Sequence, residues 1–436
     1  MSFIHNIPRW FYKEQPHEDG SKTIRIVGIK YQCKAKKTKQ PDVDTSIKDT
    51  IGALYDRHVE DFVPLATDTY ERQEGDAKVL AFYLPQFHAI PLNDKNFGRG
   101  FTEWTNVTKA KPQFFGHHQP QLPIDVGFYD LSHDDVMYRQ IELAKQYGIY
   151  GFCFYYYWFG KDKRLLEKPL FNWLNNKELD LPFCLCWANE NWSTLWDGGN
   201  RNVIMEQKME ANSAADFIED ILPFLNDERY IRINQHPVLI VYRPSLFTNE
   251  QFKMFADGLQ EEAAKRGIPR LHLLMTNACA PGNTAYSSKD WHVDGMVEFV
   301  PHGLGGKGVI QPRSIFIQDN SLTVVDLTKF LKNKEYMTMP APEGGILYKG
   351  CFPSWDNSAR KTFSNGAVYV GCTPDLYTEW LKDCITYAKK TQPEQERFVF
   401  INAWNEWAEG AHLEPDQRYG YAYLAATRKA VEESRN

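Results

Sequence analysis

Short apolar segments alternate with amphipathic segments from Lys78 to the end of the chain. This order is typical of parallel β-strands that are each followed by a helix. Eight apolar segments are present, which predicts an α/β fold of the (β/α)8 TIM-barrel class. An open doubly wound sheet is the alternative, but the chain lacks Gly-x-x-x-x-Gly-Lys and shows no nucleotide cradle leading into an expected helix. The expected strands are 78–87, 149–158, 182–189, 237–243, 271–277, 294–300, 347–353 and 397–404, and the expected helices are 134–147, 165–176, 213–226, 249–266, 324–333, 374–391 and 420–434.

The beginning of the chain differs from the rest in composition. Lys and Asp crowd residues 34–49 without the periodicity of a helix or a strand. We therefore expect a short N-terminal extension over residues 1–77 and a barrel catalytic domain over residues 78–436. A chain of 436 residues is long enough for one such barrel with insertions.

Charge and cysteine patterns exclude several classes of partner. The 50 basic and 56 acidic residues give a net charge of -6, which argues against nucleic acid because its binding needs clustered cations. The eight cysteines form no Cys-x-x-Cys pair and the 12 histidines lack metal-ligand spacing, so we expect no disulfide, metal or cofactor. The N-terminus does not resemble a signal peptide and no long apolar run occurs. These features predict a cytoplasmic protein without an integral membrane segment, and they leave its oligomeric state open.

Polar and aromatic residues gather where the expected strands end, whereas no such cluster occurs where the strands begin. In a TIM barrel, the C-terminal strand ends form the face that carries the active site. Aromatic residues make up 14% of the chain, and aromatic rings stack well on the C–H faces of sugars. This asymmetry predicts a site for an oligosaccharide or polysaccharide. The candidate substrate-binding residues are Glu103, Trp104, Tyr156, Trp158, Trp187, Asn189, Glu190, Trp192, Arg243, His302, Trp355, Asp356, Trp404 and Asn405.

The last expected strand ends in two glutamates three residues apart, Glu406 and Glu409. Cleavage of a glycosidic bond needs one carboxylic acid to protonate the departing oxygen and a second group to act at the other side of the anomeric carbon. The two glutamates can serve as this catalytic pair if the chain turns after the strand, so that both side chains point into the barrel mouth. Glu190, which follows Asn189 at the end of the third strand, makes Glu190 with Glu406 an alternative pair.

Five sequence motifs stand out: Tyr83–His88, Gly100–Asn106, Gly151–Phe159, Trp187–Trp192 and Asn402–Pro415. Together they resemble the WbsX-like proteins, a family found with bacterial O-antigen and capsule assembly. That family is similar to family 99 glycoside hydrolases, which are endo-α-mannosidases with a (β/α)8 barrel. The resemblance implies a retaining reaction through a 1,2-anhydro sugar, with Glu406 as the base at a mannose-type 2-hydroxyl and Glu409 as the acid. This chain differs from those hydrolases in having Ala408 where they usually carry His.

The residues and the resemblance predict a retaining glycoside hydrolase or transglycosylase. Its expected substrate is an α-linked, mannose-type bacterial polysaccharide or the precursor of one. A glycosyltransferase of O-antigen or capsular polysaccharide biosynthesis is one alternative, although a sugar-nucleotide donor is harder to bind without a phosphate-binding motif. A non-catalytic glycan-binding protein is the other, and the presence of both Glu406 and Glu409 speaks against it.

Overall fold

The structure is a computed structural model that divides into two compact units, residues 1–57 with 313–315 and the remainder of the chain. In the smaller unit, β1 (Tyr12–Pro16), β2 (Lys22–Ile26) and β3 (Ile29–Cys33) form an antiparallel sheet in chain order. The structure describes residues 12–16, 22–26, 29–33, 61–114, 117–194, 202–208, 213–278, 287–302, 304, 309–310, 322–361 and 366–435.

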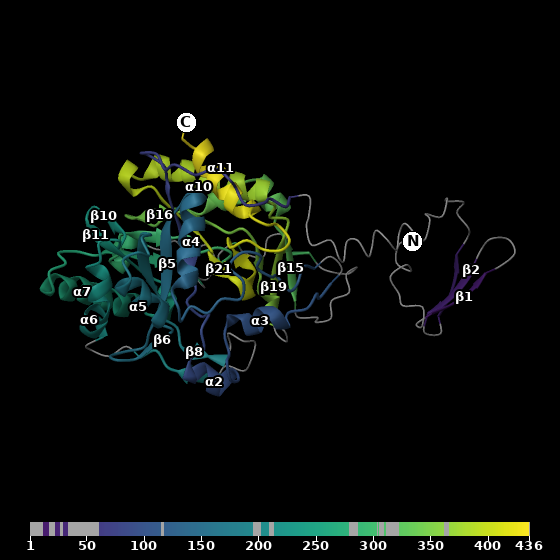
Figure 1. The fold of residues 1–436 in the computed structure, drawn as a ribbon, viewed down its shortest axis with the longest axis horizontal. Helices are drawn as coiled ribbons and strands as arrows, with labels where there is room; N and C mark the ends of the chain where they lie inside the picture. Colours follow the sequence, from purple (N-terminus) through teal and green to yellow (C-terminus); the bar gives the residue numbers. More distant parts are fainter. Residues whose placement is uncertain are drawn as a thin grey trace. The chain divides into compact units, whose positions relative to one another are not determined.

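The larger unit is built on a parallel barrel, which confirms the predicted fold class (Figure 1). Around the barrel the strands follow the order β16, β13, β12, β11, β7, β5, β4, β20 and β17. Only Lys349 separates β16 from β17, so these two segments are halves of one seventh strand, and the barrel closes through them. The strands are β4 (Lys78–Tyr83), β5 (Ile149–Trp158), β7 (Phe183–Trp187), β11 (His236–Val241), β12 (His272–Thr276), β13 (Gly295–Val297), β16 (Ile346–Tyr348), β17 (Gly350–Cys351) and β20 (Phe398–Ile401).

The barrel strands are apolar on both faces because one face fills the barrel and the other packs against helices. Every residue of β7 and β20 is buried. Helices α10 and α11 lie side by side outside the barrel (Figure 1). The main helices are α4 (Asp135–Gln146), α5 (Lys168–Asn175), α6 (Ser213–Leu225), α7 (Asn249–Lys265), α10 (Pro374–Thr391) and α11 (Ala422–Glu433), all at predicted positions.

The helix predicted at 324–333 is wrong over its first half. Residues Thr323–Asp326 form strand β15, and only Thr328–Lys332 are helical, as α9. The β-branched run Thr323-Val-Val favours the extended backbone, and β15 pairs in parallel with β19 (Ala367–Val370). With β14 (Val309–Ile310) and β18 (Trp355–Asp356), these strands form a four-stranded sheet in the order β14, β15, β19, β18.

One glycine-rich segment matches a nucleotide-binding motif in sequence only. Residues 303–308, Gly-Leu-Gly-Gly-Lys-Gly, have the spacing Gly-x-Gly-x-x-Gly. That fingerprint requires a helix to open directly after the glycines. The element that follows at residues 309–310 is instead strand β14. The segment therefore does not meet the structural requirement of a dinucleotide-binding turn.

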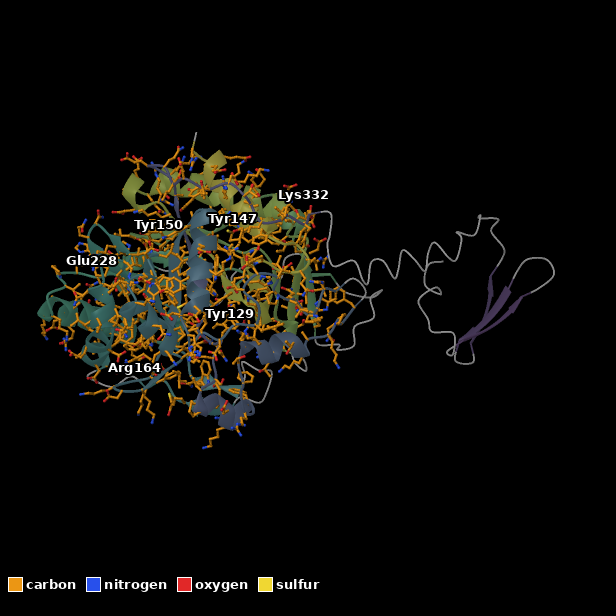
Figure 2. The ribbon with its side chains drawn as sticks, viewed as in Figure 1. Tyr129, Tyr147, Tyr150, Arg164, Glu228 and Lys332 are labelled. Atoms are coloured by element: carbon orange, nitrogen blue, oxygen red, sulfur yellow. The ribbon has the colours of Figure 1, made fainter. Side chains whose placement is uncertain are left out.

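Residues 61–77, which the sequence placed in the extension, pack against the barrel unit. The amide of Ala66 donates to the Tyr147 hydroxyl at 2.9 Å, and the guanidinium of Arg72 lies 4.8 Å from the centre of the Tyr150 ring. Figure 2 labels the two tyrosines. Near the end of the chain, Arg435 pairs with Asp76 at 2.9 Å. The domain boundary at residue 77 stays a prediction, while these contacts give residues 61–77 a defined place beside α4 and α11.

Candidate active site

A cavity opens at the C-terminal ends of the barrel strands, and both glutamates of the last strand line it. It holds about 780 Å³ of empty space, counting its open mouth. The lining residues are Leu84, Gln86, Phe97, Phe101, Glu103, Asn106, Tyr155, Tyr157, Ala188, Glu190, Asn191, Trp192, Ser193, Tyr242, Phe299, Arg360, Glu406 and Glu409.

The chain turns sharply after β20, and this turn brings the two glutamates together. Glu406 ends the short strand β21 (Asn405–Glu406), and Glu409 ends the 3-10 helix η7 (Trp407–Glu409). Gly410 then takes a positive φ of 59°, a conformation that side chains disfavour. The turn lets both carboxylates face the cavity, as the sequence predicted.

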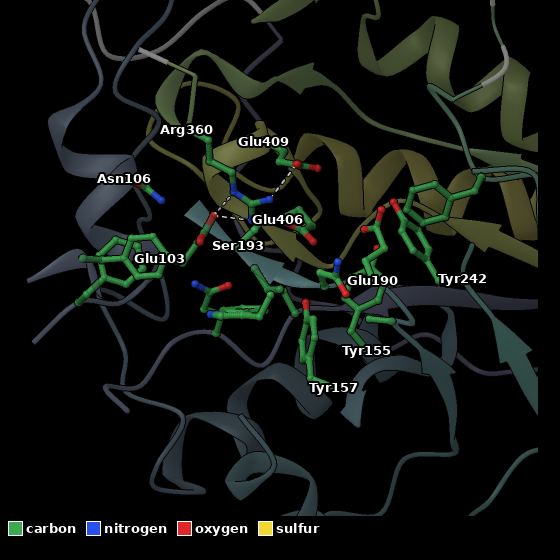
Figure 3. Close-up of a pocket in the computed structure, with 18 residues that line it drawn as sticks. Glu103, Asn106, Tyr155, Tyr157, Glu190, Ser193, Tyr242, Arg360, Glu406 and Glu409 are labelled. Atoms are coloured by element: carbon green, nitrogen blue, oxygen red, sulfur yellow. Dashed lines mark hydrogen bonds and ion pairs between the residues drawn. The ribbon is translucent and has the colours of Figure 1, made fainter. Parts of the chain in front are cut away.

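One buried guanidinium joins three carboxylates in the cavity wall. Arg360 Nη2 lies 2.8 Å from Glu406 Oε2, and Arg360 Nη1 lies 2.8 Å from Glu409 Oε1. Arg360 Nε donates to Glu103 Oε1 at 2.7 Å. Figure 3 shows Arg360 between these three acids, with Glu190 and Tyr242 across the cavity. The planar fork of arginine can bind several carboxylates at once, which a lysine ammonium does less well.

Burial and charge give Glu406 an unusual acidity. The pKa of Glu406 is raised to about 8, chiefly by burial; Arg360 lowers it, and the nearby Glu409 and Glu103 raise it. Burial lowers the pKa of Arg360, but the carboxylates of Glu103, Glu409 and Glu406 outweigh this effect and raise it well above the usual value. Arg360 therefore stays charged, and Glu406 exchanges its proton near neutral pH, as a catalytic acid or base must.

Two phenols from β5 complete the floor of the cavity. Tyr155 and Tyr157 both line it, because residues two apart on a strand point to the same face. Burial, followed by the charge of Glu406, raises the pKa of both phenols well above the usual value. Both hydroxyls therefore stay protonated near neutral pH, and they can donate hydrogen bonds to a ligand or to Glu406.

Glu190 also lines the cavity, and Arg243 holds it in place. The two side chains form an ion pair. The side chain of Asn189 fixes the backbone of Arg243, since it accepts from the amide at 2.7 Å and donates to the carbonyl at 2.9 Å. Burial raises the pKa of Glu190, and the charge of Glu409 contributes in the same direction. Glu190 is thus the fourth acid that lines the cavity, after Glu103, Glu406 and Glu409.

Behind the turn, the buried carboxylate of Glu414 accepts hydrogen bonds from four side chains. Trp407 donates to Oε2 at 2.6 Å and Trp404 to Oε1 at 3.1 Å, so the indoles on either side of Glu406 are anchored to one group. Gln140 donates at 2.6 Å and Tyr129 at 2.9 Å. Burial raises the pKa of Glu414 to about 7, and the four donors offset part of this shift. Glu414 thus ties the turn after β20 to helix α4 and to the long first crossover.

Five aromatic residues predicted to contact substrate lie instead in the core. Trp187 packs on Phe217 with ring centres 5.0 Å apart, and Trp158 lies 5.0 Å from the same ring. The Tyr156 hydroxyl bonds to Asp220, on the helix side of β5. Both faces of a barrel strand are buried, so hydrophobicity could not indicate which alternate residues face the cavity. The five residues are Trp104, Tyr156, Trp158, Trp187 and Trp404.

Of the other predicted residues, some line the cavity and the rest lie outside it. Glu103, Glu190 and Trp192 line the cavity. The six remaining residues have supporting or separate positions. Asn189 and Arg243 support Glu190, Asn405 bonds to the backbone of Leu84, His302 packs between the rings of Phe299 and Trp355, and Trp355 and Asp356 line a second cavity.

Sequence reasoning missed Arg360, and the list of candidate site residues left out Tyr155, Tyr157 and Tyr242, although they stand at the ends of expected strands. Arg360 lies 46 residues before Glu406, in a loop without a motif, so no local signal marks it. The tyrosines lie in the motif Gly151–Phe159 and at the end of β11. They could have been identified if the sequence showed which face of each strand points into the barrel. Within the described residues, no cluster of three or more His, Cys, Asp or Glu is placed to hold a metal ion. No helix in that same part of the chain is both long and apolar enough to cross a membrane.

Comparison with known proteins places the chain in a wider group. A family profile described as "Glycosyltransferase WbsX" matches residues 79–427. Two curated proteins from strains of Xanthomonas campestris pv. campestris, both described as uncharacterized protein WxcX, are 41% identical over 355 residues. The match covers 81% of this chain and 50% of each relative, so the chain spans about half of their length.

Solved structures share the fold at low sequence identity. The GH99 endo-alpha-mannosidase from Bacteroides thetaiotaomicron, in complex with BIS-TRIS-propane, superposes with a TM-score of 0.51 at 12% identity. It covers 82% of this chain and 97% of its own. A glycoside hydrolase-like protein gives a TM-score of 0.51 at 14% identity, over 86% of this chain and 98% of its own. At this identity the likeness concerns the fold.

Proposed function

Since the chain belongs to the WbsX glycosyltransferase family and has the barrel of glycoside hydrolases, we propose that it breaks or rearranges glycosidic bonds at the cavity of Glu406 and Glu409. The reaction is retaining hydrolysis or transglycosylation of an α-linked, mannose-type bacterial polysaccharide or its precursor. One observation carries this proposal: two glutamates of a single turn share the Arg360 guanidinium at the mouth of the barrel.

The two glutamates have complementary roles in this reaction. Glu406 removes the proton from the sugar 2-hydroxyl, the 2-oxygen attacks the anomeric carbon, and Glu409 gives its proton to the departing oxygen. Water or an acceptor sugar then opens the 1,2-anhydro ring, and the two acids return to their starting protonation states. Two inversions at the anomeric carbon give net retention. The raised pKa of Glu406 makes its ionised form a strong base.

Glycosyl transfer from an activated donor is the second candidate function, and the description of the matching family favours it. The two functions differ in their need for a sugar nucleotide. Mannose-rich and O-antigen oligosaccharides should be incubated with the protein, with and without sugar nucleotides, and the products identified by mass. We expect shortened or rearranged chains without any nucleotide, no product from Glu406→Gln, and normal product from the surface control Glu433→Gln. Products that form only with a nucleotide would instead support transfer, and glycan binding without any product would support a binding protein.

The pH dependence of kcat/KM should report the ionisation of Glu406. If Glu406 is the base, the free enzyme is competent only after this carboxyl has lost its proton. Since its pKa is raised to about 8, kcat/KM should rise with pH up to about this value. Initial rates at low substrate concentration across the pH range measure this profile. A fall through the same range would assign the acid role to Glu406.

Replacing Trp192 by Ala should weaken glycan binding by about 1–3 kcal/mol if its ring stacks on a sugar. Trp192 lines the cavity, with its ring centre 5.2 Å from that of Tyr157. The matched control is Trp187→Phe, because Trp187 is fully buried among core rings and does not line the cavity. Calorimetric titration of Glu406→Gln protein measures both dissociation constants without turnover. Equal effects of the two changes would argue against a contact between Trp192 and the sugar.

A further inference from the structure

A second cavity, of about 850 Å³ including its open mouth, lies next to the turn that carries the glutamates. Four segments form it: the first crossover near His117, the segment 354–356 with β18, the end of β19, and the segment 416–423 before α11. Trp355 and Asp356, predicted from the sequence to bind substrate, line this cavity rather than the first.

The two cavities share a wall. Gly410 follows Glu409 directly, and a Cβ atom there would lie 2.9 Å from the Cβ of Asp356. The Ser354 hydroxyl donates to the Gly410 carbonyl at 2.5 Å. Ser354 and Asp356 therefore face the second cavity, whereas Arg360, a few residues further along the same segment, faces the first. The turn at Glu409 and Gly410 therefore stands between the two cavities.

The two carboxylates that line the second cavity already have hydrogen-bond or ion-pair partners within the protein. Asp356 pairs with His117 at 2.6 Å and accepts from Gln119 at 2.7 Å. Asp416 accepts from the backbone amides of Arg418 and Tyr419, each at 2.7 Å. These contacts occupy the carboxylates, so a ligand would meet mainly other groups.

The groups left for a ligand are aromatic faces, neutral polar atoms and the guanidinium of Arg418. The buried His118 Nε2 has no hydrogen-bond partner among the described residues. Burial, followed by the charge of Arg418, lowers the pKa of His118 to about 4, so its imidazole is neutral near pH 7. Tyr369 and Tyr419 contribute phenol rings to the lining. Ring faces beside neutral donors and acceptors suit the alternating C–H faces and hydroxyls of a pyranose.

We propose that the second cavity binds a saccharide, namely a sugar of the substrate polymer distant from the bond that reacts. The identity of the polymer rests on the proposed function, whereas the lining chemistry of the site does not. Occupying both cavities with one chain makes the second binding event intramolecular. The protein then selects long polysaccharide chains over short fragments.

The test measures binding in Glu406→Gln protein, so that it does not depend on turnover. The probes are an α-linked mannose disaccharide and a mannose oligosaccharide of roughly ten sugars. We expect His118→Ala and Tyr369→Ala each to raise the dissociation constant of the long probe about tenfold, with that of the disaccharide unchanged. The control is His133→Ala, an exposed histidine of the same crossover. Thermal unfolding of each variant checks that the fold is intact.

The outcomes separate this proposal from the proposed function. An unchanged dissociation constant for the long probe in both folded variants would overturn the second site, even if the wild-type protein cleaves glycans. Equal losses for the disaccharide and the long probe would overturn it as well, because they place the effect in the first cavity. A selective loss for the long probe supports the second site, even if no turnover is found.

Discussion

Replacing Glu409 by Gln should lower turnover of substrates with poor leaving groups by about 10²–10⁴-fold, the usual contribution of a general acid. The amide cannot protonate the departing oxygen, although it keeps the shape of the carboxyl group. Binding and folding should change little, because Arg360 keeps its contacts with Glu103 and Glu406. The measurement is kcat for an unactivated glycoside, with calorimetric binding as the check.

The matched comparison for Glu409→Gln is an aryl glycoside whose phenol departs without a proton. Its turnover should fall much less, because the first step then no longer needs an acid. The same comparison with Glu190→Gln decides between the two candidate acids. If Glu190→Gln shows the leaving-group dependence and Glu409→Gln does not, the acid is Glu190.

Replacing Arg360 by Met should destabilise the protein by about 3–5 kcal/mol near neutral pH, since it leaves buried carboxylates without their shared cation. Arg360 contacts Glu103, Glu406 and Glu409 and is itself buried. Turnover should fall at least as far as it does for Glu409→Gln, because the positions and acidities of both glutamates depend on the guanidinium.

The stability deficit of Arg360→Met should depend on pH. Without the cation, the buried carboxylates repel one another, and the folded state takes up protons that the unfolded chain releases. Stability then falls as pH rises, so the deficit is smallest in mild acid and grows through neutral pH. Urea unfolding at several pH values measures it. Arg360→Lys is the control that keeps the charge, and a deficit that does not vary with pH would contradict the electrostatic explanation.

The barrel was predictable because its strands are buried on both faces and their apolar runs are continuous. This signal marks where strands are, but it does not mark interruptions within them. The predicted strand 347–353 is in fact two halves on either side of the fully buried Lys349. The Nζ of Lys349 lies 3.3 Å from Glu298 Oε1 and donates to the Tyr336 carbonyl at 2.9 Å. Partners this distant in sequence leave no local pattern.

The candidate site was predictable where one short segment of the chain contains both candidate catalytic residues. Glu406 and Glu409 belong to a single turn, so their common cavity followed from spacing and context. Their catalytic roles stay predictions. The prediction of substrate-binding aromatic residues was wrong for a different reason. Tyr155 and Tyr156 are neighbours in β5 but face opposite sides of the strand. Sequence alone does not show which side of a doubly buried strand faces the cavity.

The three acids around Arg360 give the empty cavity an excess of negative charge. When one of these three acids holds a proton, the other two still outnumber the single guanidinium between them, and Glu190 forms an ion pair with Arg243. A sugar ring that becomes electron-poor as its anomeric bond stretches would be favoured in such a field. Ring mimics that carry a protonated nitrogen should consequently outcompete uncharged sugars of the same shape.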